Sequence, residues 1–231
     1  MEFHWRDHAD GGCSVGCPAC DAEAKQERMD ARASMDANRP RALSLTPPWP
    51  TAILDLGKTV ENRTRLPSPK YRGPLYLHAS NLRPRVEFHE AVQAILRALE
   101  TTPDDARLRG IAKRHLLAGS ARLAAGREWS NWEPDVRIVQ GAIVGVADVV
   151  GIVTRIGERS GWMVREGDEQ SRHRDLTPTE RRWWFGGPAY LLANVRRLCT
   201  PVPCRGRQGL WRPSPEVHAA VQAELEASRH G

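Results

Sequence analysis

The segment 48–80, PWPTAILDLGKTVENRTRLPSPKYRGPLYLHAS, decides the fold because it runs from a predicted helix into a predicted strand. Prolines at its start suit the first turn of a helix. Trp49, Ala52 and Leu56 then recur at helical spacing as one apolar stripe. Gly57 follows as a suitable helix end.

The end of the same segment alternates between two kinds of side chain, as a strand does. Leu75, Leu77 and Ala79 fall on one face, and Tyr76 and His78 on the other. We therefore expect a strand with two chemically different faces here.

The rest of the chain continues this mixture of helices and strands. Apolar residues recur at helical spacing over 88–99 and 108–123, and a last helix is expected to open at Ser214. Residues 141–156, rich in β-branched residues and glycine, predict one or two strands with a bulge or bend, and GWMVRE and AYLLANVRRL predict two more. Strands separated irregularly by helices favour an α+β fold built on a small β-barrel with flanking helices. The expected organisation is a cysteine-rich tail with a helix (1–40), a barrel domain (41–217) with a helical insertion at about 82–135, and a C-terminal helix (218–231).

Charge is distributed unevenly along the chain. Residues 1–40 hold five Lys or Arg and eight Asp or Glu, whereas the other residues carry a net charge of +9. Such a basic body suits a polyanionic partner such as RNA, although it is also common on ordinary solvated surfaces. No apolar run approaches the roughly 20 residues that cross a bilayer, and the first residues lack the layout of a secretory signal. We expect a cytoplasmic protein that does not bind membranes.

Three cysteines lie close together near the start of the chain. Cys13, Cys17 and Cys20 have the spacing C-x3-C-x2-C, and His8 or His4 is near enough in sequence to complete a tetrahedral zinc site. The alternative is plain reduced cysteines in a tail. The sequence leaves both interpretations open.

The segment KTVENRT carries the most informative pattern of charges. If it is extended, Glu61, Arg63 and Arg65 share one face, so a carboxylate stands among bases. Nearby positive charge favours the ionised carboxylate, which can accept hydrogen bonds from an exocyclic amine. The alternative is a surface ion-pair network on an edge strand.

Several ordered motifs resemble the ASCH family of PUA-like β-barrel domains. PWPTAILDLGKTVENR, the following YRG and LHAS resemble the family's opening, and GAIVGVADVV its central strand, which usually ends in an acidic residue, here Asp148. WWFGGPAYLLANVRRL and PVPCRGRQGLW resemble its closing motifs, so that the likeness covers roughly 45–217. The resemblance implies a PUA-like barrel whose cleft binds RNA or a modified nucleotide.

Two positions depart from the family pattern. Gly57 directly precedes Lys58, whereas the family glycine stands two positions before the lysine. In the amidohydrolase subgroup that removes acetyl from N4-acetylcytidine, the motif is K-T-x-T, and the second threonine is replaced here by Glu61. A carboxylate does not act as an activated hydroxyl does, which argues against that mechanism in this chain.

The resemblance also implies a set of candidate site residues. We expect RNA or nucleotide binding, with a hydrolase acting on nucleic acid or modified nucleosides (a ribonuclease or amidohydrolase) as the alternative and a protein-interaction module as a second alternative. The catalytic candidates are Lys58, Glu61 and His78, and the ligand-binding candidates are Asn62, Arg63, Tyr71, Arg72, Ser80, Asp148 and Trp183. Apart from a zinc ion in the tail, no cofactor is expected.

Overall fold

The structure is a computed structural model that describes Lys25 and residues 40–65, 68, 70–81, 85–100, 106–113, 116, 139–155, 161–166 and 173–228. The chain divides into two compact units, 1–39 and 40–231. Apart from Lys25, every described residue belongs to the second unit, so the fold below is the fold of that unit. Of the expected cysteine-rich tail (1–40), all residues except Lys25 and Pro40 lie outside the described residues.

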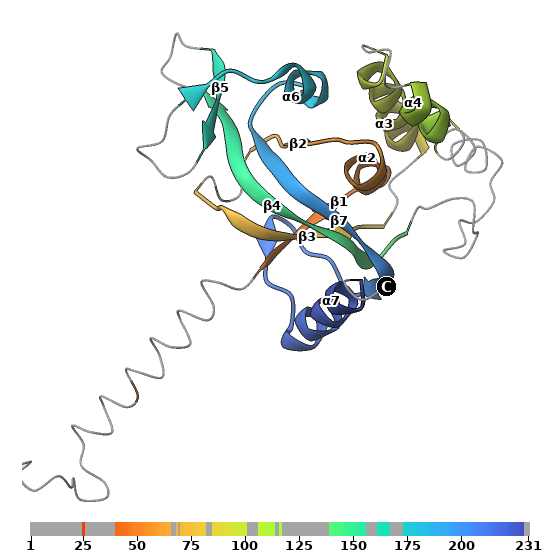
Figure 1. The fold of residues 1–231 in the computed structure, drawn as a ribbon, viewed down its shortest axis with the longest axis vertical. Helices are drawn as coiled ribbons and strands as arrows, with labels where there is room; N and C mark the ends of the chain where they lie inside the picture. Colours follow the sequence, from red (N-terminus) through yellow and green to blue (C-terminus); the bar gives the residue numbers. More distant parts are fainter. Residues whose placement is uncertain are drawn as a thin grey trace, which may run out of the picture. The chain divides into compact units, whose positions relative to one another are not determined.

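The described part of the chain is an α+β fold in which one curled, mixed sheet forms a half-barrel (Figure 1). Its main path runs β2-β7-β4-β3-β1-β8, while β5 pairs with β4 and β6. β1 and β3 are parallel, and the other pairs are antiparallel. The strands are β1 (Arg41–Leu45), β2 (Val60–Asn62), β3 (Gly73–Ala79), β4 (Ala142–Arg155), β5 (Trp162–Glu166), β6 (His173–Arg174), β7 (Ala189–Pro203) and β8 (Leu210–Trp211). The described helices are α2 (Trp49–Asp55), α3 (Arg85–Ala98), α4 (Ala106–Ala112), α6 (Pro178–Trp183) and α7 (Pro215–Ala227).

The curl of the sheet originates in the long β4–β7 pair. Its register shifts at three points along β4, and such bulges bend a strand and increase its twist. At one of them, a Cβ on Gly145 would lie 2.4 Å from a Leu54 side-chain carbon and 2.7 Å from the Arg196 carbonyl oxygen. Glycine therefore lets α2 approach the inside of the curl. The expected bulged strand over 141–156 is confirmed as a single strand.

Helices cover both faces of the half-barrel. On one face, α2 packs on β3 and β7, with Ile53 beside Leu75 and Leu77 in one apolar cluster. On the other face, α7 covers the sheet, with Val221 and Leu225 beside Tyr76. The two-faced character expected for residues 73–80 is confirmed, and each face has its own core.

Local sequence patterns located most of these elements. The helices expected around 49–56, 88–99 and 215–227 are confirmed, and α7 has the expected cap because the Ser214 side chain accepts a hydrogen bond from the Val217 amide. The sequence analysis missed β1, α6 and the two-residue strands β6 and β8. β1 is a short strand between two core layers, and α6 begins with a capping box in which the Thr177 and Glu180 side chains each bond the other's backbone.

Candidate functional site

A pocket of about 300 Å³ opens where β1 ends, α2 begins and β2 passes beneath them. This volume is at the lower end of the roughly 300–1,000 Å³ typical of small-molecule sites. The pocket is lined by Ser44, Leu45, Thr46, Pro47, Trp49, Lys58, Glu61, Asn62, Arg63, Glu87, Ala91 and Phe185.

The turn after α2 places Lys58 at the base of this pocket. Gly57 adopts φ +71°, a left-handed conformation that favours glycine, and the Lys58 amide then donates to the Ala52 carbonyl at 3.0 Å. The turn directs the lysine side chain inward, where it is only 1% exposed. Its Nζ donates to the Val60 carbonyl and lies 5.4 Å from the centre of the Trp49 ring.

Glu61 joins this lysine to an arginine. Its Oε2 accepts a hydrogen bond from Lys58 Nζ at 2.8 Å, and its Oε1 lies 3.5 Å from Arg63 Nη1. Glu61 lies in β2, and Arg63 follows directly after the end of that strand. Lys58, Glu61 and Arg63 thus line the same pocket and contact one another through the carboxylate.

Burial is the main influence on the pKa of Lys58. The pKa of Lys58 is lowered, mainly because burial removes water from the ammonium group, while the charge and hydrogen bond of Glu61 act in the opposite direction. Arg63 adds a smaller lowering through repulsion. A lysine that loses its proton more easily than usual can serve in proton transfer as well as in charge pairing.

Two aromatic rings form one wall of the pocket, and a single side chain fixes the outer one. Phe185 is 46% exposed and lies 5.6 Å from Trp49 between ring centres. Asn62 donates from Nδ2 to the Trp183 carbonyl and accepts from the Phe185 amide, each at 2.8 Å. Asn62 thus lines the pocket but uses its amide to hold the turn that presents Phe185.

His78 faces the opposite side of the sheet. It is 2% exposed, its ring packs edge-on against Trp211 at 5.6 Å, and its Nε2 bonds the Cys204 carbonyl at 3.1 Å. His78 is not among the residues that line the pocket, because alternation along β3 turns its ring away from α2, and it instead ties the chain at Cys204 to the sheet. Burial lowers the pKa of His78, while the bond to Cys204 opposes that shift.

Other sequence candidates also lie outside the pocket lining. The hydroxyl of Tyr71 bonds the Pro74 carbonyl, and Arg72 donates to the carbonyls of Tyr71 and Arg165. Asp148 accepts from Asn194 at 2.8 Å, and the Ser80 hydroxyl faces Asn81. Trp183 is fully buried in the core between α2 and α3, so its ring offers no face to a ligand. Tyr71, Arg72, Ser80 and Trp183 are therefore not among the residues that line the pocket, whose aromatic side chains are Trp49 and Phe185.

The metal candidates Cys13, Cys17, Cys20 and His8 lie outside the described residues. Within the described part, no group of His, Cys, Asp or Glu is arranged to hold a metal ion. None of the described helices combines the length and apolar character needed to cross a membrane.

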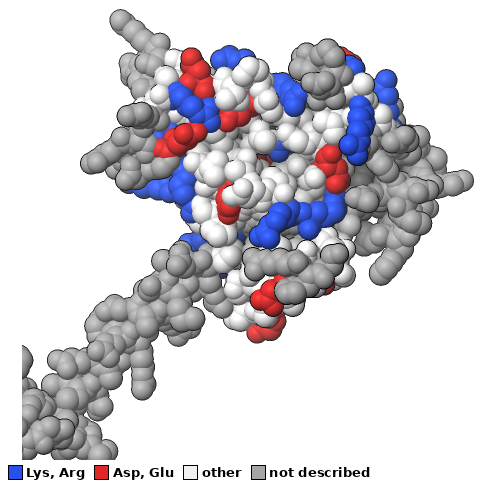
Figure 2. All heavy atoms as spheres, viewed as in Figure 1, with Lys and Arg blue, Asp and Glu red and all other residues white. Residues whose placement is uncertain are grey.

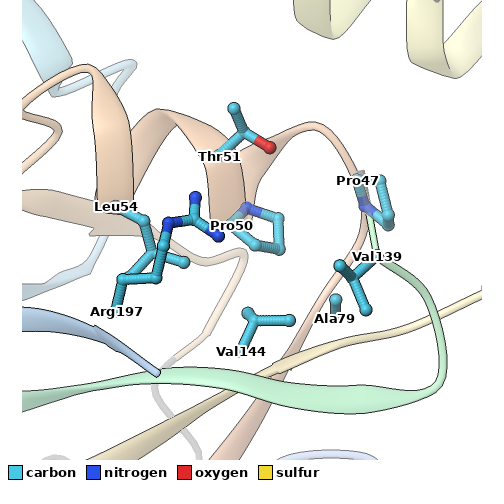
Figure 3. A pocket seen from close by; sticks show the side chains of 8 residues that line it. All are labelled: Pro47, Pro50, Thr51, Leu54, Ala79, Val139, Val144 and Arg197. Atoms are coloured by element: carbon cyan, nitrogen blue, oxygen red, sulfur yellow. The ribbon is translucent and has the colours of Figure 1, made fainter. Parts of the chain in front are cut away.

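A second hollow lies on the other side of α2, between that helix and β4 (Figure 3). Its volume is about 10 Å³, which is space for roughly one water molecule. Arg197 at its edge is already paired with Asp55. We therefore place the candidate site in the larger pocket.

Charge on the face shown in Figure 2 does not single out one binding area. In the view of Figure 2, Lys and Arg of the described residues alternate with Asp and Glu.

No protein-family model matches the chain, and no curated protein matches it.

Proposed function

We propose that the pocket binds the base of a nucleotide or of single-stranded RNA, as the resemblance to ASCH domains implies. The observation that carries the proposal is the buried carboxylate of Glu61 in a pocket with an aromatic wall. An ionised carboxylate accepts hydrogen bonds from the exocyclic amine of a base. An aromatic side chain offers the flat surface on which bases stack in single-stranded recognition.

The fixed geometry of the site supports this proposal. Lys58 and Arg63 hold the two oxygens of Glu61 in place, and Asn62 fixes the turn of Phe185. A site whose groups are already ordered loses little freedom when the ligand binds. The wall and the carboxylate lie in the same pocket, so one planar ligand can contact both.

Titration of the full chain with the four ribonucleosides and their monophosphates, followed by calorimetry, tests the proposal. We expect binding of a base that carries an exocyclic amine, and a loss of affinity of roughly tenfold or more in Glu61→Gln, since a hydrogen bond to a charged group is worth about 1.5–3 kcal/mol. The matched control is Glu166→Gln, which removes an exposed carboxylate paired with Arg174. Equal affinity for all bases in wild type and Glu61→Gln would show that Glu61 does not recognise the base.

The lowered pKa of Lys58 favours a second candidate function, which is hydrolysis of RNA or of a modified nucleoside. Lys58 is buried beside a carboxylate in a pocket, and burial lowers its pKa. Perturbed groups of this kind are common in acid–base catalysis. Glu61 stands where the amidohydrolase subgroup has threonine, so Glu61 is a base candidate here and not an alcohol nucleophile.

Turnover assays separate the two functions. RNA and N4-acetylcytidine are incubated with the wild type, Lys58→Ala and Glu61→Ala. Turnover by the wild type that both substitutions abolish would assign hydrolysis to this pocket. Activity that survives both would exclude the pocket as its site, and binding without turnover would leave the protein a binding module.

A further inference from the structure

We propose that Glu87 of α3 accepts hydrogen bonds from the ribose hydroxyls of the ligand, so that the pocket prefers ribonucleosides and RNA to their deoxy counterparts. Glu87 lies in the first turn of α3 and lines the same pocket as Glu61. The proposal rests on the proposed function and adds to it a residue that selects the sugar.

The two carboxylates of the pocket differ in how far their oxygens are already used. Glu61 is 5% exposed, and its two oxygens face Lys58 and Arg63. Glu87 is exposed, and within the described ranges its side chain forms no hydrogen bond or ion pair. An ionised carboxylate can accept about four hydrogen bonds. Glu87 therefore keeps its whole accepting capacity for a ligand, whereas Glu61 keeps only a part of it.

Depth in the pocket assigns the two carboxylates to different parts of a nucleoside. Glu61 is buried, so it can contact only a group that enters the pocket fully, such as the amine at the edge of a base. Glu87 lines the pocket and is also in contact with solvent, which places it at the opening. When the base lies against the aromatic wall, the part of a nucleoside that remains at the opening is the sugar.

The helix α3 holds Glu87 on a fixed support. Phe88 and Val92 are at most 2% exposed and belong to the core cluster against which Trp49 also packs. Glu87 and Ala91 are one helical turn apart, and both line the pocket. The short side chain of Ala91 leaves space beside the carboxylate for a sugar ring.

The chemistry of a free carboxylate suits ribose better than it suits phosphate. Acidic side chains accept hydrogen bonds from ribose hydroxyls in dinucleotide-binding folds, and such bonds are strengthened by the negative charge. The same charge repels a phosphate. The 2′-hydroxyl is the group by which a protein distinguishes RNA from DNA. A carboxylate at the opening of the pocket would therefore select the ribose form of the ligand.

The test compares ribonucleosides with 2′-deoxynucleosides by calorimetry on the full chain. The probes are adenosine, cytidine and guanosine, which carry exocyclic amines, and their 2′-deoxy forms. We expect the wild type to bind the ribose form of its preferred base roughly tenfold or more tightly than the deoxy form. Glu87→Ala should bind both forms with the affinity that the wild type has for the deoxy form. The matched control is Glu90→Ala, which removes an exposed carboxylate of the same helix that does not line the pocket, and it should keep the wild-type preference.

Each other outcome has a definite meaning. If the wild type binds ribose and deoxy forms equally, the role of Glu87 is wrong and the base pocket stands. If Glu87→Ala keeps the preference for ribose, another residue selects the sugar and the proposal is again wrong. If Glu90→Ala loses the preference to the same extent, the effect comes from the overall charge of α3, which also overturns the proposal. If the wild type binds none of the six probes, the proposed function fails and the role of Glu87 fails with it. Unchanged circular dichroism melting curves show that the variants are folded.

Discussion

The buried pair formed by Lys58 and Glu61 makes an asymmetric prediction about stability. The two side chains are 1% and 7% exposed, and their atoms are 2.8 Å apart. Removing one partner of such a pair leaves an uncompensated buried charge, at a cost of about 3–5 kcal/mol. The two partners are not equivalent, because Glu61 has a second cation in Arg63, whereas Lys58 has no other carboxylate partner among the described residues.

We therefore expect Glu61→Gln to lower the free energy of unfolding by about 3–5 kcal/mol. Lys58→Met should cost less, about 1–3 kcal/mol, because Arg63 still faces the carboxylate and burial of the lysine itself opposes its charged form. The double variant Lys58→Met/Glu61→Leu should come within about 1–2 kcal/mol of the wild type, since apolar replacements of a buried pair are often neutral.

Urea unfolding of the full chain at pH 7, followed by tryptophan fluorescence, measures these differences. For a domain of this size, a loss of 3–5 kcal/mol corresponds to a fall of roughly 6–20 °C in Tm. Glu166→Gln is the control, because its exposed carboxylate should contribute no more than about 1 kcal/mol. The reasoning is refuted if Glu61→Gln is as stable as this control, or if the two single losses simply add in the double variant.

Three further predictions concern the sheet face opposite the pocket and the pocket wall. The pKa of His78 is lowered in the folded protein, so on acidification the imidazole is protonated in the unfolded chain before it is protonated in the folded one. The free energy of unfolding should therefore keep its full value above about pH 6.5 and fall as the pH drops below it. Unfolding measured from pH 7.5 to 5 should show this loss in the wild type and a smaller one in His78→Gln; identical profiles would contradict it. Gly206→Ala should cost about 1–3 kcal/mol in urea unfolding, since its Cβ would lie 2.4 Å from the histidine ring, whereas Gly161→Ala, with no atom within 4 Å, should cost much less. Asn62→Ala should weaken base binding in calorimetry and cost about 1–3 kcal/mol, because the backbone around Phe185 loses its anchor; unchanged affinity would show that this anchor does not shape the site.

Sequence analysis located the helices and strands that are defined by a pattern of neighbouring residues. The stripe of α2 and the alternation of β3 each depend on neighbouring residues, and both are present where expected. The capping box at Thr177 is an equally local signal that would have revealed α6. β1 has no such local pattern. It is only five residues long and both of its faces are covered, so it is recognised as a strand only through its pairing with β3 and β8.

The same distinction applies to the candidate site. Glu61 and Arg63 are two positions apart, so an extended segment was expected to place them on one face, whereas Lys58 was a candidate through the family resemblance. Phe185 reaches them only through the pairing of β2 with β7 and the bond from Asn62, which spans 123 positions. His78 was misplaced for a related reason. Alternation showed that it faces away from Leu77, but local sequence does not tell which face of the sheet borders the pocket.

The pairing of β1 with β8 has a consequence for how the protein acquires its shape during synthesis. Ser44 and Trp211, which hydrogen-bond to each other, are separated by 167 positions. At roughly 5–20 residues per second, a ribosome needs about 8–30 s to produce the second partner after the first. During that interval the outer edge of β1 has no neighbour, and a nascent chain with an open strand edge is prone to misassembly. Chaperone dependence should therefore be greatest late in translation and should end when residues 210–211 leave the exit tunnel.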